Sequence, residues 1–115
     1  MPCLEVTTNV PKDKIPADFA KVTVDLIAKL LGKPASYVVV VIRSDATMSW
    51  AGDDSPAAVV HLTSIGQIDR AKNKKTSAAL YPHFEKNLGI SGERMYIMFH
   101  DMAGENVGYS GSTFG

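Results

Sequence analysis

The stretch LLGKPASYVVVVIR, residues 30–43, decides the fold of this chain. It holds the end of a helix, a short loop and a strand. Gly32 followed by Pro34 is a helix stop signal. Residues 37–43 are rich in β-branched side chains, which predicts a strand. A helix that leads through a short loop into a strand is typical of a βαβ unit.

The residues before this stretch complete the first unit. Residues 16–31 carry apolar side chains at helical spacing. These are Phe19, Val22, Leu26, Ile27, Leu30 and Leu31. Pro16 fits only in the first turn of such a helix. Near the N-terminus, the segment CLEVTT alternates apolar and polar side chains, which predicts a strand.

The second half of the chain repeats this plan. Residues 57–65 (AAVVHLTSI) predict a strand, residues 69–88 a helix, and residues 94–101 (RMYIMFHD) another strand. The polar stretch SDATMSWAGDDSP separates the two halves. We therefore expect an α/β (α+β) chain with tandem βαβ units in a single domain, residues 1–115. Its four-stranded mixed sheet is expected to carry two helices on one face.

Pro82 lies well inside the second expected helix, in AALYPHFEKNL. A proline there removes a backbone donor and costs about 3 kcal/mol or more. We expect a kink at this point or a break of the helix into two pieces.

The strand at residues 37–43 is apolar on both faces. Tyr37, Val39 and Val41 point to one side, and Val38, Val40 and Ile42 point to the other. Two helices cover only one face of a sheet, so a lone chain would leave the other apolar face in water. We therefore expect a homo-oligomer that buries this face.

The composition argues against several partners. The chain has 12 basic and 12 acidic residues, and its only basic cluster is RAKNKK, residues 70–75. This balance argues against nucleic acid or an anionic membrane as the main partner. The longest apolar run, VVVVI, is far too short to span a bilayer. The segment MPCLEVTTNV lacks the pattern of a signal peptide, so we expect a cytoplasmic location.

Metal and thiol chemistry have little support in the sequence. Cys3 is the only cysteine, so we expect no intrachain disulfide and no thiol-based metal site. His61, His83 and His100 fall on separate expected elements without ligand spacing. This distribution argues against a metal site or a histidine-based triad.

The second residue, in MPCLEV, raises a chemical question. Methionine aminopeptidases generally tolerate a small second residue, so Pro2 would become the N-terminus. One reading is a proline at a strand start, where proline is permitted. The other is a catalytic base, a secondary amine whose direction is fixed by its ring. These six residues alone favour the first reading.

Five blocks of the chain resemble one known family: MPCLEVTTNVP, GKPASYV, TSIGQI, RMYIMFHDM and NVGYSGSTFG. In this order they resemble the macrophage migration inhibitory factor family of the tautomerase superfamily. The resemblance implies a homotrimer whose three sheets form a barrel-like core. It also implies keto–enol tautomerase activity on phenylpyruvate-type 2-oxo acids and dopachrome-like compounds, with no cofactor and no metal. Animal members also act as cytokines that leave cells without a signal peptide, so a secreted fraction is expected.

The resemblance implies a role for each residue near the reacting atoms. Pro2 would be the general base, which requires a free N-terminus. Lys33 would hold the substrate carboxylate, although a cation just past a helix end also suits the helix dipole. Ser64 and Ile65 would contact the substrate, the latter through its backbone N–H.

The resemblance also implies the walls of the pocket. Tyr96 would be donated across a subunit interface. The positions matching the pocket rim are Tyr37, Val107, Tyr109 and Phe114. Better-known vertebrate members carry asparagine at the position of Met98, so this pocket is expected to be more apolar. Ala57 and Val60 replace the two cysteines of a CxxC motif, which excludes a dithiol oxidoreductase activity there.

Three functions stay open at this point. The first is a tautomerase with Pro2 as its base. The second is a cytokine that binds a cell-surface receptor and whose pocket is vestigial. For this role, Lys12 and Asp45 match positions proposed in the family to mimic a chemokine receptor motif. The third, independent of the family, is a ferredoxin-like βαβ module that binds a small ligand or a partner. Only the first depends on a free Pro2.

Overall fold

The computed structural model describes residues 1–115. Its main elements are β1 (Pro2–Thr8), α1 (Phe19–Leu31), β2 (Val39–Arg43), β3 (Ala58–Ser64), α2 (Arg70–Leu88) and β4 (Met95–Asp101). A hairpin of two short strands, β5 (Gly108–Tyr109) and β6 (Ser112–Thr113), follows them. The single-turn 3-10 helices are η1 (Lys12–Lys14), η2 (Ala35–Tyr37), η3 (Gly92–Arg94) and η4 (Gly104–Asn106).

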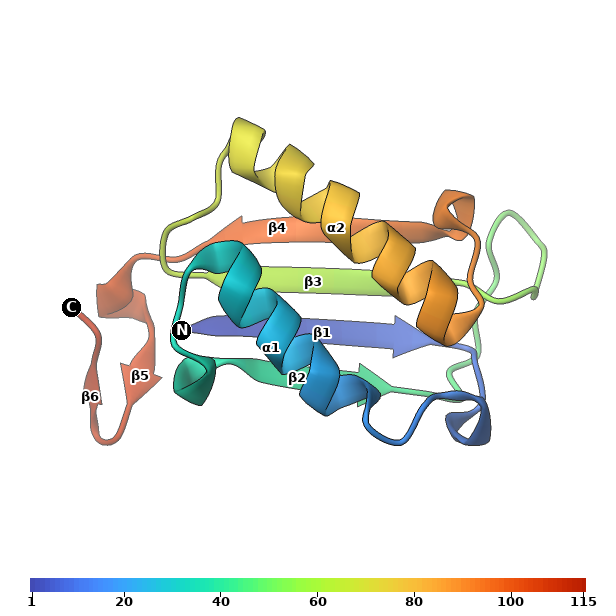
Figure 1. Ribbon diagram of the computed structural model, residues 1–115, viewed down its shortest axis with the longest axis horizontal. Helices are drawn as coiled ribbons and strands as arrows, with labels where there is room; N and C mark the ends of the chain where they lie inside the picture. Colours follow the sequence, from blue (N-terminus) through green and yellow to red (C-terminus); the bar gives the residue numbers. More distant parts are fainter.

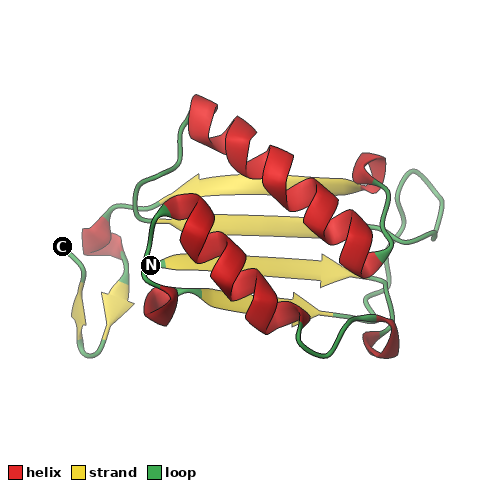
Figure 2. Ribbon diagram, in the orientation of Figure 1, coloured by secondary structure: helices red, strands yellow, loops and turns green.

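The four long strands form one mixed sheet in the order β2-β1-β3-β4. β1 runs parallel to β2, and β3 runs parallel to β4. The two halves meet where β1 and β3 pair antiparallel. Both helices lie across the same face of the sheet (Figure 1; Figure 2). The predicted tandem βαβ arrangement, with a mixed sheet and two helices on one face, is therefore confirmed.

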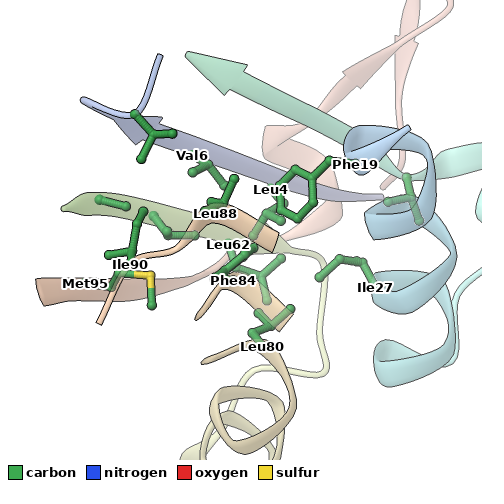
Figure 3. Close-up of a cluster of buried hydrophobic side chains, with 14 of the residues drawn as sticks. Leu4, Val6, Phe19, Ile27, Leu62, Leu80, Phe84, Leu88, Ile90 and Met95 are labelled. Carbon is green, nitrogen blue, oxygen red and sulfur yellow. The ribbon is translucent and has the colours of Figure 1, made fainter. Parts of the chain in front are cut away.

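The core lies between the sheet and the two helices (Figure 3). The central strands β1 and β3 contribute alternate side chains, with Leu4 and Leu62 fully buried. Above them pack Phe19 from α1 and Leu80 and Phe84 from α2. Each such side chain stabilises the fold by about 1.5–3 kcal/mol as it leaves water. This packing holds β1 and β3 in place, and the candidate site begins where these two strands meet.

The helix boundaries follow the predicted signals with one shift. α1 ends at Gly32 (φ 62°) and α2 ends at Gly89 (φ 66°), both in the left-handed region that glycine adopts without strain. α1 begins at Phe19 because Pro16 starts a separate turn, in which the Phe19 N–H donates to the Pro16 carbonyl at 3.0 Å. Neither helix combines the length and apolar character needed to cross a membrane.

β2 begins at Val39 rather than at Tyr37, which corrects the predicted strand boundary. Pro34 precedes the 3-10 turn η2, and the Tyr37 N–H donates to the Pro34 carbonyl at 3.0 Å. The Val38 N–H donates to Ala35 at the same distance. These two N–H groups are therefore not available to the sheet, and Tyr37 leaves the alternation of the strand.

Of the two outcomes expected at Pro82, a kink or a break, the break is wrong, because α2 runs through Pro82 as one helix. Leu80 and Phe84 are both fully buried, and they fix the helix on each side of the proline. The Tyr81 hydroxyl also donates to the Met95 carbonyl oxygen at 2.7 Å. These contacts outweigh the local cost of a proline in a helix.

The second face of the sheet is not covered by a helix (Figure 1). Val39, Tyr96 and Met98 are exposed there by 52%, 63% and 37%. The predicted second apolar face is therefore present. It also carries charge, because Arg43 forms an ion pair with Glu5 at 3.0 Å.

Candidate active site

The candidate site begins at Pro2, the first residue of β1. Its Cα pairs with that of Ser64, the last residue of β3, and both residues are fully buried. The Ser64 hydroxyl oxygen has no hydrogen-bond partner. A buried polar group left unpaired costs about 1–3 kcal/mol. Such an atom next to Pro2 therefore points to a functional reason for the serine.

The loops that follow α1 and β3 meet the N-terminus. Lys33 Nζ donates to the Ile65 carbonyl oxygen at 3.0 Å. The Ile65 N–H in turn donates to the Met1 carbonyl oxygen at 3.3 Å. The fold thus brings the Met1–Pro2 bond, Lys33 and Ile65 together from three distant parts of the sequence.

The end of α1 sets the position of Lys33. Its backbone N–H donates to the Ala28 carbonyl at 3.0 Å, directly after the left-handed Gly32. This hydrogen-bond pattern is typical of a Schellman end and fixes the first residue of the loop. The Lys33 ammonium also follows the negative end of the helix dipole. The dipole role and a role in the site are therefore compatible.

The loop after β3 is held by β4 and by the residue that follows it. The Gly66 N–H donates to Asp101 Oδ1 at 3.0 Å. The Met102 N–H donates to the Ser64 carbonyl oxygen at 2.9 Å. These bonds fix the backbone on both sides of Ile65, so its N–H keeps its direction toward the N-terminus.

The surroundings of the N-terminus disfavour a positive charge. Burial lowers the pKa of the Met1 amino group, and the nearby Lys33 ammonium lowers this pKa further. Both effects penalise the protonated amine. An amine at this end of the sheet is therefore unprotonated at a lower pH than an ordinary exposed terminus.

Three aromatic rings, Tyr37, Tyr109 and Phe114, form an aromatic wall. Tyr37 meets Tyr109 and Phe114 at ring-centroid distances of 5.7 and 5.9 Å, and the latter two stack at 5.2 Å. The Phe114 N–H donates to the Val107 carbonyl at 3.1 Å, which ties the end of the chain to the start of the hairpin. The hairpin and the N-terminus lie at the same end of the sheet (Figure 1). The aromatic wall therefore stands at the end where Pro2 lies.

Tyr96 and Met98 lie away from this end. In the sheet register Tyr96 is level with Val59 and Thr7, near the opposite end of β1 from Pro2. At the rise of a strand this separation is on the order of 15 Å. Both side chains also lie on the uncovered face, whereas Pro2 is buried on the helix side. A single chain therefore does not bring Tyr96 and Met98 to the other predicted site residues.

The sequence-based predictions missed two side-chain pairs. Trp50, between β2 and β3, packs on Tyr96 with ring centroids 4.6 Å apart. His61 Nδ1 and His100 Nε2 lie 2.8 Å apart, a contact that the sequence analysis did not predict. Alternation along β3 and β4 places both histidines on the uncovered face, and this signal was present in the sequence. No group of three or more His, Cys, Asp or Glu side chains is arranged to hold a metal ion.

Comparisons with known proteins point to one family. The family model described as macrophage migration inhibitory factor (MIF) matches residues 1–115. The chain is 48% identical over 114 residues to the macrophage migration inhibitory factor homolog of Trichuris trichiura, covering 99% of this chain and 100% of that protein. It is 40% identical over 114 residues to the macrophage migration inhibitory factor of Mus musculus, with 99% of each chain covered. The solved structure of the macrophage migration inhibitory factor from Trichinella spiralis matches with a TM-score of 0.96 at 40% identity, covering 97% of this chain and 99% of that one.

Proposed function

The chain belongs to the macrophage migration inhibitory factor family, and we propose that it is a cofactor-free keto–enol tautomerase with Pro2 as its base. The proposed substrates are aromatic 2-oxo acids of the phenylpyruvate type and dopachrome-like compounds. The observation that carries this proposal is the meeting of the chain's N-terminus with Lys33 and the Ile65 N–H. These groups provide a base, a cation and a backbone donor in one small region.

The proposed reaction moves one proton between carbon and oxygen. Once Met1 is removed, the Pro2 nitrogen is a secondary amine rather than an amide, so it can accept a proton. It takes the proton from the carbon next to the ketone, and the electron pair of that C–H bond forms the enolate. The protonated amine then returns the proton to the enolate oxygen. Burial and the Lys33 ammonium lower the pKa of the Met1 amino group, and the same surroundings favour the unprotonated form of a Pro2 amine.

The Met1 carbonyl group suggests how a substrate oxygen is held. Its oxygen accepts a hydrogen bond from the Ile65 N–H at 3.3 Å, and this N–H becomes free when Met1 leaves. A substrate oxygen then takes the same donor. The Lys33 ammonium forms an ion pair with the substrate carboxylate. The Ser64 hydroxyl, which has no partner in the chain, forms a further hydrogen bond to the substrate.

The aryl group of the substrate packs on the aromatic wall. Ligand pockets for such compounds are lined mainly by apolar and aromatic side chains with few polar groups. Val107 lies beside Phe114 in the same hairpin and extends the apolar lining. The wall is open to solvent in one chain, so a second copy is needed to close the pocket.

We place the closing residues on a neighbouring copy in a homotrimer. Tyr96 and Met98 are exposed on the uncovered face and far from Pro2 in their own chain. A neighbour can present both side chains to the aromatic wall. The Met98 thioether is only a weak hydrogen-bond acceptor for a ring hydroxyl, so phenylpyruvate is preferred over 4-hydroxyphenylpyruvate.

The direct test is phenylpyruvate tautomerase activity, followed by ultraviolet absorbance, on protein whose mass confirms the loss of Met1. Pro2→Gly and Pro2→Ala are measured beside it, and light scattering reports the oligomeric state of each sample. We expect activity in the processed protein and its collapse in both variants while the trimer persists. A correctly processed trimer without activity on phenylpyruvate or on a dopachrome-like substrate would refute the enzyme.

A second candidate function is a cytokine that acts through a cell-surface receptor. The observation that favours it is the contact between two exposed loops, in which the Lys12 N–H donates to Asp45 Oδ2 at 3.1 Å. This contact holds residues 12 and 45 side by side, and both are exposed. Such a role requires that part of the protein leaves the cytoplasm and reaches the outside of the cell. Receptor binding by the inactive Pro2→Gly protein, and its loss in Lys12→Ala or Asp45→Ala, would separate this function from catalysis.

A further inference from the structure

Trp50 is the only tryptophan of the chain, and its indole ring covers one side of Tyr96. The ring centroids are 4.6 Å apart with an interplanar angle of 35°. Tyr96 is nevertheless 63% exposed, so the rest of its surface is free to contact another molecule. Aromatic pairs at this distance restrain each other and contribute more than their buried area alone.

The connection that carries Trp50, residues 44–57, is long but anchored at its C-terminal part. Arg94 donates hydrogen bonds to the carbonyl oxygens of Pro56 at 3.0 Å, Ser55 at 2.8 Å and Asp53 at 3.2 Å. Asn9 accepts a hydrogen bond from the Ala57 N–H at 2.9 Å. Arg94 directly precedes β4, so the same backbone positions the anchor and Tyr96.

Trp50 begins a tight turn whose backbone is held by hydrogen bonds. Trp50 and Asp53 exchange two backbone hydrogen bonds, at 2.9 and 3.0 Å. Between them, Ala51 (φ 53°) and Gly52 (φ 86°) both occupy the left-handed region. A non-glycine residue rarely adopts this conformation, and it persists only when surrounding contacts hold it. The two hydrogen bonds of this turn therefore fix the backbone of Trp50.

We propose that Trp50 is a positioning residue that holds the ring of Tyr96 in the orientation needed to contact the substrate aryl group in the pocket of a neighbouring copy. This inference rests on the proposed function, in which Tyr96 completes that pocket. On an exposed strand position an unsupported tyrosine ring samples several rotamers. The stack with Trp50 selects among them before the substrate binds, which lowers the entropic cost of binding.

A positioning role differs from a general role in packing the uncovered face. If Trp50 acts through Tyr96, its removal has no further effect once Tyr96 is gone. If Trp50 only supports the sheet or the oligomer, its removal weakens the protein whether or not Tyr96 is present. A double-mutant cycle separates these two roles.

The experiment compares the processed wild-type protein with Trp50→Ala, Trp50→Phe, Tyr96→Ala and the double variant Trp50→Ala/Tyr96→Ala. Thr47→Ala is the matched control, because Thr47 is an exposed residue of the same connection. We expect Trp50→Ala to raise KM for phenylpyruvate by about three- to tenfold, the value of one aromatic pair, with a smaller change in kcat. We expect Trp50→Phe to restore KM to within about twofold, because a phenyl ring keeps the stack.

The inference is overturned if Trp50→Ala leaves KM unchanged, or if its effect on KM is as large in the Tyr96→Ala background as in the wild type. Loss of the oligomer in Trp50→Ala, detected by light scattering and not restored by Trp50→Phe, also overturns it, because Trp50 then acts on assembly.

Tryptophan fluorescence separates this inference from the proposed function. If the processed protein turns over no substrate, the proposed tautomerase fails, and the dissociation constant of phenylpyruvate is measured by quenching of Trp50. The Trp50 variants are then compared by calorimetry, since Trp50→Ala has no tryptophan to report. A weaker dissociation constant in Trp50→Ala, restored in Trp50→Phe, supports positioning without catalysis. Absence of binding to the wild-type protein overturns both.

Discussion

Lys33 Nζ and the Ile65 carbonyl oxygen form a 3.0 Å hydrogen bond that joins the end of α1 to the loop after β3. This bond holds a positive charge beside the N-terminus, where it lowers the pKa of the Met1 amino group after the larger effect of burial. One lysine therefore serves the geometry of the loop and the charge state of the amine.

Replacement of Lys33 by glutamine is expected to weaken substrate binding and to shift the pH profile. Without the ammonium the pKa of the terminal amine rises, so a higher pH is needed to leave the base unprotonated. The acidic limb of kcat/KM against pH should therefore move to higher pH, and KM for phenylpyruvate should rise. Lys33→Arg keeps the charge and should keep the limb in place. If the acidic limb of kcat/KM lies at the same pH in Lys33→Gln as in the wild type, Lys33 does not affect the protonation of the base.

Removal of the Ser64 hydroxyl should separate stability from activity. The hydroxyl oxygen is buried without a partner, so Ser64→Ala is expected to leave the free energy of unfolding unchanged or to raise it by about 1 kcal/mol. The same variant should lower kcat/KM by about tenfold or more, since a hydrogen bond to a charged group is worth about 1.5–3 kcal/mol. Urea denaturation and the tautomerase assay measure the two effects. Unchanged kcat/KM would show that the hydroxyl does not contact the substrate.

His83 should make the stability of the fold depend on pH. Burial lowers the pKa of His83, and Lys86 lowers this pKa further. Thr23 Oγ1 donates to the Phe19 carbonyl at 2.6 Å and so accepts from His83 Nε2. Asn87 Nδ2 lies 3.3 Å from His83 Nδ1, and this nitrogen accepts a hydrogen bond only in the neutral ring. Because the folded pKa is below the ordinary 6.5, the unfolded chain binds the proton first as the pH falls.

The contribution of neutral His83 is therefore complete above pH 6.5 and is lost as the pH falls from there through the lower folded pKa. Urea midpoints measured between about pH 8 and pH 5 should decline more steeply in the wild type than in His83→Gln, which has no proton to bind. His61→Gln is the matched control on another element. Equal slopes in the wild type and His83→Gln would contradict this account.

Replacement of Pro82 by alanine is expected to stabilise the chain. α2 is continuous through Pro82, so alanine fits the same backbone and restores the missing N–H donor. The free energy of unfolding should rise by at most about 3 kcal/mol, the difference between the two residues inside a helix. Denaturant titration measures this change, with exposed Glu85→Ala on the same helix as a control. A loss of stability would show that the helix needs the proline for its packing on the sheet.

The order of the elements could be predicted from local patterns. Alternation in residues 3–8 and 94–101, the β-branched run in residues 37–43 and the apolar run in residues 57–65 indicated the four strands. Helical spacing in residues 16–31, and a glycine directly after a leucine at Gly32 and Gly89, indicated where the helices lie and end. These signals depend only on residues close in the sequence, so they can be recognised in a short segment without the rest of the chain. The hairpin β5–β6 was missed because each of its strands is too short to show a period.

The candidate site was predictable only in part. Matching motifs named Pro2, Lys33, Ser64 and Ile65, and the structure brings these residues together. Motifs did not reveal that Lys33 contacts the Ile65 carbonyl, or that Trp50 covers Tyr96. Such contacts depend on where long loops return to the sheet, which no short stretch of sequence encodes.

The sequence by itself determined the tandem βαβ plan and the two-sided apolar character of the sheet, because hydrophobic periodicity and glycine stops act over a few residues. The tertiary structure alone decided that Tyr37 closes a turn instead of starting β2, and that α2 passes Pro82 without a break. Alternation placed His61 and His100 on one face of the sheet, but only the strand register decided that they meet. In each case the outcome rests on strand register and on packing of distant side chains, and these contributions outweigh the local preferences visible in the sequence.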